Sequence, residues 1–241
     1  MYVGADSLVS LKRAETTNVV GTTTKLFVVS ETCCASMENC YGGFIQNPAG
    51  GNPTLVFLPA ELTRICKNDS AIQEPLAVKI ERVVSNFTLP FRTYVSSVGC
   101  TNCETRVTFM GFDKDREEFF MWSYVFTGTN APALNRVWAI GKGDAKGRFV
   151  AQGQESFFGT LFSLPPGGED KLAALRTQQF VKTRNDIDDG LAVPEQEVVS
   201  WILEILNADE KWAIPLGFDD RPIGGPYLIV KITGEGMSQL R

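Results

Sequence analysis

Histidine is absent from the 241 residues of this chain. Its imidazole has the ordinary pKa nearest to neutral pH, so it is the most frequent general base, metal ligand and pH switch in proteins. Ser-His-Asp and Cys-His nucleophilic sites, and zinc or iron sites built on histidine, are therefore excluded within the chain. Catalysis would have to use carboxylates, Lys, Tyr, Ser, Thr or Cys, and the absence favours a protein that is not an enzyme.

Long apolar runs are also missing. The longest, at 201–206 and 227–232, are far shorter than the ~20 residues that a membrane-spanning helix needs. Residues 1–7 show neither the basic segment nor the apolar run of a secretory signal. We therefore expect a soluble protein with no signal peptide, no transmembrane segment and no membrane partner, located in a virion or in the cytoplasm.

Positive charge is scarce, since 23 Lys and Arg accompany 28 Asp and Glu, giving a net charge of −5. No cluster of basic and aromatic residues is present to bind a phosphate backbone, so we expect no nucleic-acid partner. The acidic residues gather at 169–220, where twelve Asp and Glu accompany five Lys and Arg. This segment is either a solvated helical face or a docking face for a basic partner or a neighbouring copy.

The composition provides enough apolar sequence for a large core, because 44% of the residues are hydrophobic and a chain of this length buries roughly 70–75% of its unfolded surface. Short runs with period-two alternation dominate up to residue 164 and then give way to helical spacing. We predict an α+β fold: a β-rich antiparallel sheet, sandwich or barrel core with two C-terminal helices and a final strand returning to the sheet. The predicted parts are an N-terminal arm or edge strand over 1–24, a β-rich body with a cysteine cluster over 25–164, and an acidic helical segment with the final strand over 165–241, packed on the same core.

The same patterns place individual elements. Strands are predicted at 25–30, 54–58, 76–84, 94–99, 105–110, 119–127, 135–140, 148–152, 156–164 and 227–233. Helices are predicted over 59–67, where proline suits the first turn, over 172–181, and from Pro194 onward along a wide apolar stripe. Residues 31–53 are predicted to be a loop that holds three cysteines, and 165–168 to be an internal boundary.

The cysteines are confined to one part of the chain. The residues available for disulfides or zinc are Cys33, Cys34, Cys40, Cys66, Cys100 and Cys103. Structural disulfides, with fifteen pairings open if all six take part, or isolated buried thiols are the favoured interpretation. Cys100 and Cys103 have zinc-knuckle spacing, so a structural zinc site with Cys40 and Cys33 or Cys34 is an alternative, and zinc is the sole cofactor suggested. A redox-active Cys100/Cys103 pair is less favoured, because it lies between strand patterns rather than at a helix start.

Three further segments resemble ligand sites only loosely. The glycines at 141–147 fit neither a P-loop nor a dinucleotide fingerprint and predict a hairpin turn. Asp186, Asp188 and Asp189 fail the EF-hand pattern but leave a looser calcium site open. Asp219 and Asp220 lie in a loop rich in Gly and Pro, where catalytic or binding groups are often found.

Large aromatic residues lie on both faces of the strand predicted at 119–127. Rings on both faces imply burial on both sides, either beneath a second layer of the same chain or in a contact between subunits. The candidate interface residues are Phe119, Phe120, Trp122, Tyr124 and Phe126.

Taken together, the features favour a structural, self-assembling subunit of a large particle, such as a virion capsid or tail. Its expected partners are copies of itself and other subunits of the assembly, and it would act through contacts, with no catalytic residue assigned. The alternative is a histidine-free hydrolase or carbohydrate-binding module that uses carboxylates near Asp219 and Asp220.

Overall fold

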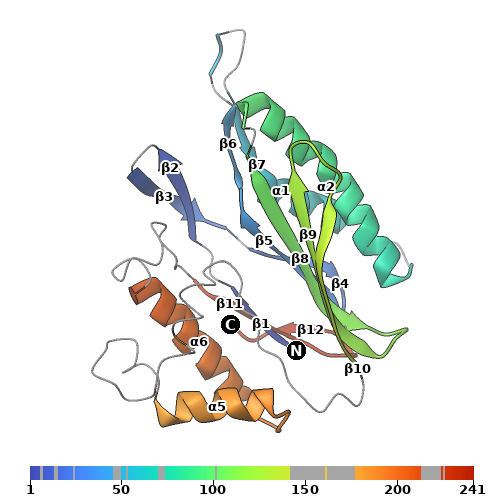
Figure 1. The fold of residues 1–241 in the computed structure, drawn as a ribbon, viewed down its shortest axis with the longest axis vertical. Helices are drawn as coiled ribbons and strands as arrows, with labels where there is room; N and C mark the ends of the chain where they lie inside the picture. The colour runs from blue at the N-terminus through green and yellow to red at the C-terminus, as the bar shows by residue number, and fades with distance from the viewer. Residues whose placement is uncertain are drawn as a thin grey trace. The chain divides into compact units, whose positions relative to one another are not determined.

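The structure is a computed structural model, and it divides into two compact units (Figure 1). The first unit contains residues 1, 23–142 and 231–238, and the second contains 2–22, 143–230 and 239–241. The structure describes residues 1–5, 8–13, 16–23, 25–45, 50–52, 54–69, 74–100, 102–141, 161, 177–212, 224 and 226–241. Of these, 8–13, 16–22, 44, 69, 136–138, 140–141 and 178 are described by their backbone alone.

A five-stranded antiparallel sheet forms the centre of the first unit. Its order is β10-β9-β8-β5-β4, and each neighbouring pair is antiparallel. The strands are β4 (Leu26–Ser30), β5 (Cys33–Asn39), β8 (Glu104–Asp113), β9 (Glu118–Thr127) and β10 (Ala133–Gly141). β4, β8, β9 and β10 confirm the strands predicted at 25–30, 105–110, 119–127 and 135–140. Alternating residues and turns with Gly, Asn or Asp made these strands recognisable in the sequence.

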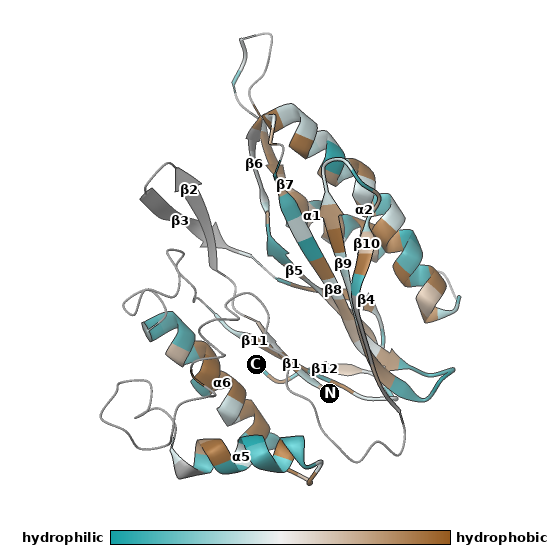
Figure 2. Ribbon diagram, viewed as in Figure 1, coloured by the Kyte–Doolittle hydropathy of each residue, from teal (hydrophilic) through white to brown (hydrophobic). Residues whose placement is uncertain are grey.

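Two helices, α1 (Leu58–Asp69) and α2 (Leu76–Val98), pack with the sheet around one hydrophobic core. The helix predicted at 59–67 is confirmed by α1. The strands predicted at 76–84 and 94–99 are wrong, since both segments belong to the 23-residue α2. Its buried positions include Ile80, Val84, Phe87 and Phe91, whose spacing of three and four residues places them on one helical face. Figure 2 shows hydrophobic and hydrophilic residues in turn along α2, as expected of an amphipathic helix.

Part of the loop predicted over 31–53 is also wrong, because β5 and the short strand β6 (Gly42–Ile45) lie within it. β6 pairs with β7 (Thr54–Phe57), which confirms the strand predicted at 54–58. Cys33, Cys34 and Ala35 of β5 are each at most 1% exposed, so the first part of this strand is buried on both faces. A strand that is covered on both faces shows no alternation of apolar and polar residues, and its pattern is therefore missed.

The second unit contains α5 (Gln178–Asp188) and α6 (Glu195–Trp212), which pack together through Phe180 and Trp201. The indole Nε1 of Trp201 donates to the backbone oxygen of Phe180 at 3.1 Å. These helices confirm the two predicted C-terminal helices, although α5 begins six residues later than the predicted 172. α6 begins directly after Pro194, as predicted.

The final predicted strand is β11 (Leu228–Ile232), and it lies in a three-stranded sheet of order β1-β11-β12. The other members are β1 (Tyr2–Ala5) and β12 (Met237–Gln239). β2 (Leu8–Arg13) and β3 (Thr16–Thr22) form a separate antiparallel pair, so much of the predicted N-terminal arm is strand. The predicted α+β class with antiparallel sheets and a returning C-terminal strand is confirmed; that strand pairs with the N-terminal β1.

Several predictions fall on residues outside those that the structure describes. They are the strand at 148–152, the strand at 156–164 apart from residue 161, the boundary at 165–168, the turn at 142–147, and the pair Asp219 and Asp220. In the described part of the chain, no helix is both long and apolar enough to cross a membrane.

Candidate assembly interface

The five candidate interface residues lie on β9, the second strand from one edge of the sheet. Phe120 and Phe126 are 2% and 1% exposed, and Phe126 makes edge contacts with Phe87 and Phe91 of α2 at centroid distances of 5.1 and 6.2 Å. Phe120 and Phe126 therefore form part of the chain's own core and are not available to a partner. This corrects their assignment to an interface in favour of the internal alternative.

The remaining three candidates are partly buried. Trp122 and Tyr124 pack against the same core cluster, and Phe119 contacts the ring of Phe112 at 5.0 Å. Between them, Met121 is 8% exposed and Ser123 is fully buried, so both faces of β9 are covered. β9 is therefore buried on both faces, as its aromatic residues predicted, and the covering residues belong to the same chain.

Among the side chains that the structure describes, two large apolar residues of the sheet are exposed, one at each edge. Val28 on β4 is 59% exposed, and Leu134 on β10 is 48% exposed. β4 and β10 are the two ends of the strand order, and each has a hydrogen-bonded neighbour on one side only among the described strands. An edge strand presents unpaired backbone groups that can pair with another chain. We call β4 and β10 with these two residues the open edges.

Each open edge contains a β-bulge beside its exposed apolar residue. The register shifts between Val28 and Ser30 on β4, and between Leu134 and Arg136 on β10. A bulge interrupts regular pairing and turns a side chain away from its ordinary direction. Bulges at edges limit unselective pairing, so a partner has to match the bulged shape.

Strand direction limits how two copies can meet at these edges. Four successive antiparallel pairings separate β4 from β10, so the two edge strands run in the same direction. A two-fold axis brings β10 beside β10, or β4 beside β4, in antiparallel pairing, whereas simple translation brings β10 beside β4 in parallel pairing. Antiparallel pairs are somewhat more stable per residue, and two-fold contacts are the commonest in oligomers.

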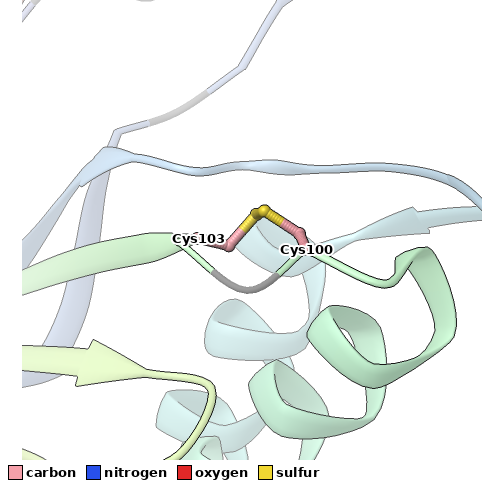
Figure 3. Close-up of a disulfide and its surroundings, with 2 residues drawn as sticks. All are labelled: Cys100 and Cys103. Atoms are coloured by element: carbon pink, nitrogen blue, oxygen red, sulfur yellow. A yellow bond between two sulfur atoms is a disulfide. The ribbon is translucent and has the colours of Figure 1, made fainter.

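One disulfide is formed among the six cysteines, between Cys100 and Cys103, whose Cα atoms are 5.5 Å apart (Figure 3). It follows Gly99, which ends α2 in the left-handed conformation, and it precedes β8. The zinc alternative is not supported, because these two sulfurs bond to each other and no group of three or more Cys, Asp or Glu among the described residues could hold a metal ion. The network of three disulfides is wrong as well.

The other four cysteines are thiols, and Cys33, Cys34 and Cys66 are each at most 1% exposed. Burial raises the pKa of the Cys34 thiol to about 12. Burial, followed by the nearby Cys34 and Cys66, also raises the pKa of Cys33. Cys40 is half-buried, and desolvation raises its pKa despite hydrogen bonds to Gly42 and Tyr94. Because the thiolate is the reactive form of cysteine, the raised pKa values of Cys33, Cys34 and Cys40 make these thiols less reactive.

We predict that native protein treated with iodoacetamide at pH 8 is not alkylated at Cys33, Cys34 or Cys66, and is alkylated at Cys40 more slowly than the unfolded chain. Each raised pKa keeps its thiol neutral at this pH. Denaturation should open four sites, and reduction of the Cys100–Cys103 disulfide should open two more. Mass spectrometry counts the labels, and six labels on denatured, unreduced protein would contradict the disulfide.

The calcium site that the sequence left open at Asp186, Asp188 and Asp189 is not formed among the described residues. Lys182 Nζ pairs with Asp186, and Arg184 Nε pairs with Asp188 Oδ2 at 2.5 Å, each one helical turn apart. Neither carboxylate joins a group of three potential metal ligands among the described residues. Ion pairs of this kind, four residues apart, are typical of a solvated helical face, the first of the two interpretations of the acidic segment.

The open edges were not recognised in the sequence, although both strands were. Val28 and Leu134 are ordinary apolar residues of predicted strands, and the sequence does not state which strand lies at an edge. That property depends on the order β10-β9-β8-β5-β4, in which β5 and β8 are neighbours although α1 and α2 separate them in the chain.

Comparisons with known proteins assign no family to this chain. No protein-family model matches it, and neither does any curated protein. Among solved structures, the Anbu (Gly-1) mutant from Hyphomicrobium sp. strain MC1 is similar at a TM-score of 0.41 and 11% identity, over 99% of this chain and 81% of that chain. A likeness at this level supports no argument about fold or activity.

Proposed function

We propose that the protein is a structural, self-assembling subunit of a larger particle, such as a capsid or tail, and that it acts through contacts between copies. The observation that carries the proposal is the pair of open edges, each with a largely exposed apolar side chain, Val28 or Leu134. A subunit with two separate self-contacting surfaces can extend an assembly beyond a dimer.

The expected strength of each contact follows from its chemistry. Burying one Val or Leu contributes about 1.5–3 kcal/mol, and strand pairing adds backbone hydrogen bonds of about 0.5–1.5 kcal/mol each. Association itself costs roughly 4–15 kcal/mol in lost freedom, so a single edge contact is weak. A stable particle then depends on many such contacts formed together, and assembly should depend on protein concentration.

The test replaces each exposed residue by lysine, a charge that natural edge strands use against pairing. Leu134→Lys and Val28→Lys should each weaken the contact at their own edge by roughly tenfold or more, because the apolar burial is lost. If the contacts are two-fold, each single variant stops at dimers and the double variant is monomeric. If β4 pairs with β10, either single variant gives monomers. Sedimentation velocity measures the masses.

Leu191→Lys is the matched control, because Leu191 is equally exposed at 59% but lies outside any strand. It should assemble as the unchanged protein does. If Val28→Lys, Leu134→Lys and the double variant all assemble like the unchanged protein, the open edges are not the contacts and the proposal fails. Thermal unfolding of each variant checks that the fold is retained, as expected for substitutions at exposed positions.

A further inference from the structure

A groove of about 340 Å³ lies between α2 and the segment that joins β9 to β10. Four of its lining residues, Glu81, Ser85, Thr88 and Arg92, follow one another on α2 at steps of four, three and four. This spacing places them in one stripe along the helix. The opposite side of the groove is formed by Tyr124, Ala131 and Pro132.

Arg92 is held in place at one end of the stripe. Its Nη2 donates to the backbone oxygen of Asn130 at 2.8 Å, in the segment that joins β9 to β10. Its Nε is buried and has no hydrogen-bond partner among the described residues. A buried N–H of a charged group without an acceptor is costly. Arg92 also lines the groove, and a ligand carboxylate matches the forked geometry that its guanidinium favours.

Glu81 supplies the opposite charge at the other end. It is exposed, and its carboxylate lies near Tyr124, whose pKa is raised by burial and then by the charge of Glu81. Arg92 is eleven positions after Glu81, which is about 16 Å along the helix axis. Between the two charges lie Ser85 and Thr88; the Thr88 hydroxyl donates to the Val84 oxygen at 2.8 Å and so can accept a hydrogen bond from a ligand.

Apolar surface borders the same stripe. Leu89 is 72% exposed and lies four residues after Ser85 and three before Arg92, and Val84 lines the groove itself. An extended peptide presents polar backbone and apolar side chains together, which matches a polar stripe with an apolar border better than a uniformly hydroxylated sugar does. About three to five extended residues cover the distance between the charged groups once the lengths of their side chains are allowed for.

We propose that this groove binds a short extended peptide of three to five residues with free ends, its carboxylate on Arg92 and its amino group at Glu81. This is a second binding surface, and it does not depend on self-assembly. The size of the groove is at the lower end of the range for ligand sites, which fits a ligand of this kind.

The test is calorimetric titration of the full chain with four probes: Ala-Leu-Ala-Ala with free ends, its C-terminal amide, its N-acetyl form, and maltose. The free peptide should bind more tightly than either blocked form, by roughly tenfold or more for the amide, because a charge-assisted hydrogen bond is lost. Arg92→Gln should abolish the preference for the free carboxylate, and Glu81→Gln the preference for the free amine.

Arg64→Gln is the matched control, because Arg64 is an exposed arginine of α1 that pairs with Glu61. It should leave every affinity unchanged. The proposal is overturned if no peptide binds at millimolar concentration, if maltose binds and the peptides do not, or if blocking the carboxylate leaves affinity unchanged. The comparison of the probes on the unchanged protein decides the matter even if Arg92→Gln unfolds.

Discussion

Replacing Phe126 by alanine should lower the free energy of unfolding by about 3–5 kcal/mol, the usual cost of removing a buried ring from a core. The Phe126 side chain is 1% exposed and contacts the rings of Phe87 and Phe91. Phe126 packs between the sheet and α2, so its replacement by alanine leaves a cavity between these two layers. Total stability is usually about 5–15 kcal/mol, and this single change removes much of it.

Denaturant unfolding followed by circular dichroism measures the effect of Phe126→Ala. Leu89→Ala is the matched control, because it also removes a large apolar side chain, but one that is 72% exposed. It should change stability by no more than about 0.5 kcal/mol. An equal loss in the free energy of unfolding for the two variants would contradict the placement of Phe126 in the core and would indicate that its side chain is exposed.

The second large effect is expected for Gly42→Ala at the start of β6. Gly42 has a φ of 109°, and a Cβ there would lie 2.1 Å from the backbone oxygen of Val56. Non-glycine residues at such a φ cost about 1–3 kcal/mol, and a forced overlap with backbone adds about 1–3 kcal/mol. The oxygen cannot move away freely, because Gly42 and Phe57 are paired in the β6–β7 ladder. We expect a total loss of about 2–6 kcal/mol.

Gly50→Ala separates the two causes. Gly50 also has a positive φ, 76°, but a Cβ there meets nothing within 4 Å. Its variant should therefore show the backbone cost alone, about 1–2 kcal/mol. The measurement is again denaturant unfolding of both variants under the same conditions. A loss for Gly42→Ala no larger than that for Gly50→Ala would show that β6 and β7 do not approach each other as described.

The sequence predicts β8, β9 and the start of α6 well, because each has an uninterrupted pattern with a clear beginning. β9 alternates between faces from Phe119 onward, and α6 has Pro194 before it and a continuous apolar stripe. The error at α2 has a physical cause as well. Valines and isoleucine at alternate positions favour a strand, and Pro90 lies inside the helix, where proline is normally unfavourable. In a strand, Val78 and Ile80 would lie on the same face, but Val78 is 46% exposed whereas Ile80 is fully buried, as a helix allows. This difference in exposure cannot be read from the sequence.

The candidate sites were harder to predict than the elements, because they depend on residues far apart in the chain. Cys100 and Cys103 form the disulfide, but the sequence left all fifteen pairings of the six cysteines open and also allowed zinc. The peptide groove needs Arg92 beside Asn130, and the open edges need the full strand order. Neither relation leaves a local pattern. The missing histidine excludes catalytic sites that need an imidazole, but it says nothing about where contacts form.

The proposed association of the chain with itself through its open edges is tested most directly by the mass of the native particle. Sedimentation velocity or light scattering over a range of protein concentrations should show species that are multiples of 26.5 kDa and that grow with concentration. Association through apolar edge contacts should also persist at raised salt, because apolar burial is not screened. A constant mass of 26.5 kDa at every concentration and salt would contradict the account.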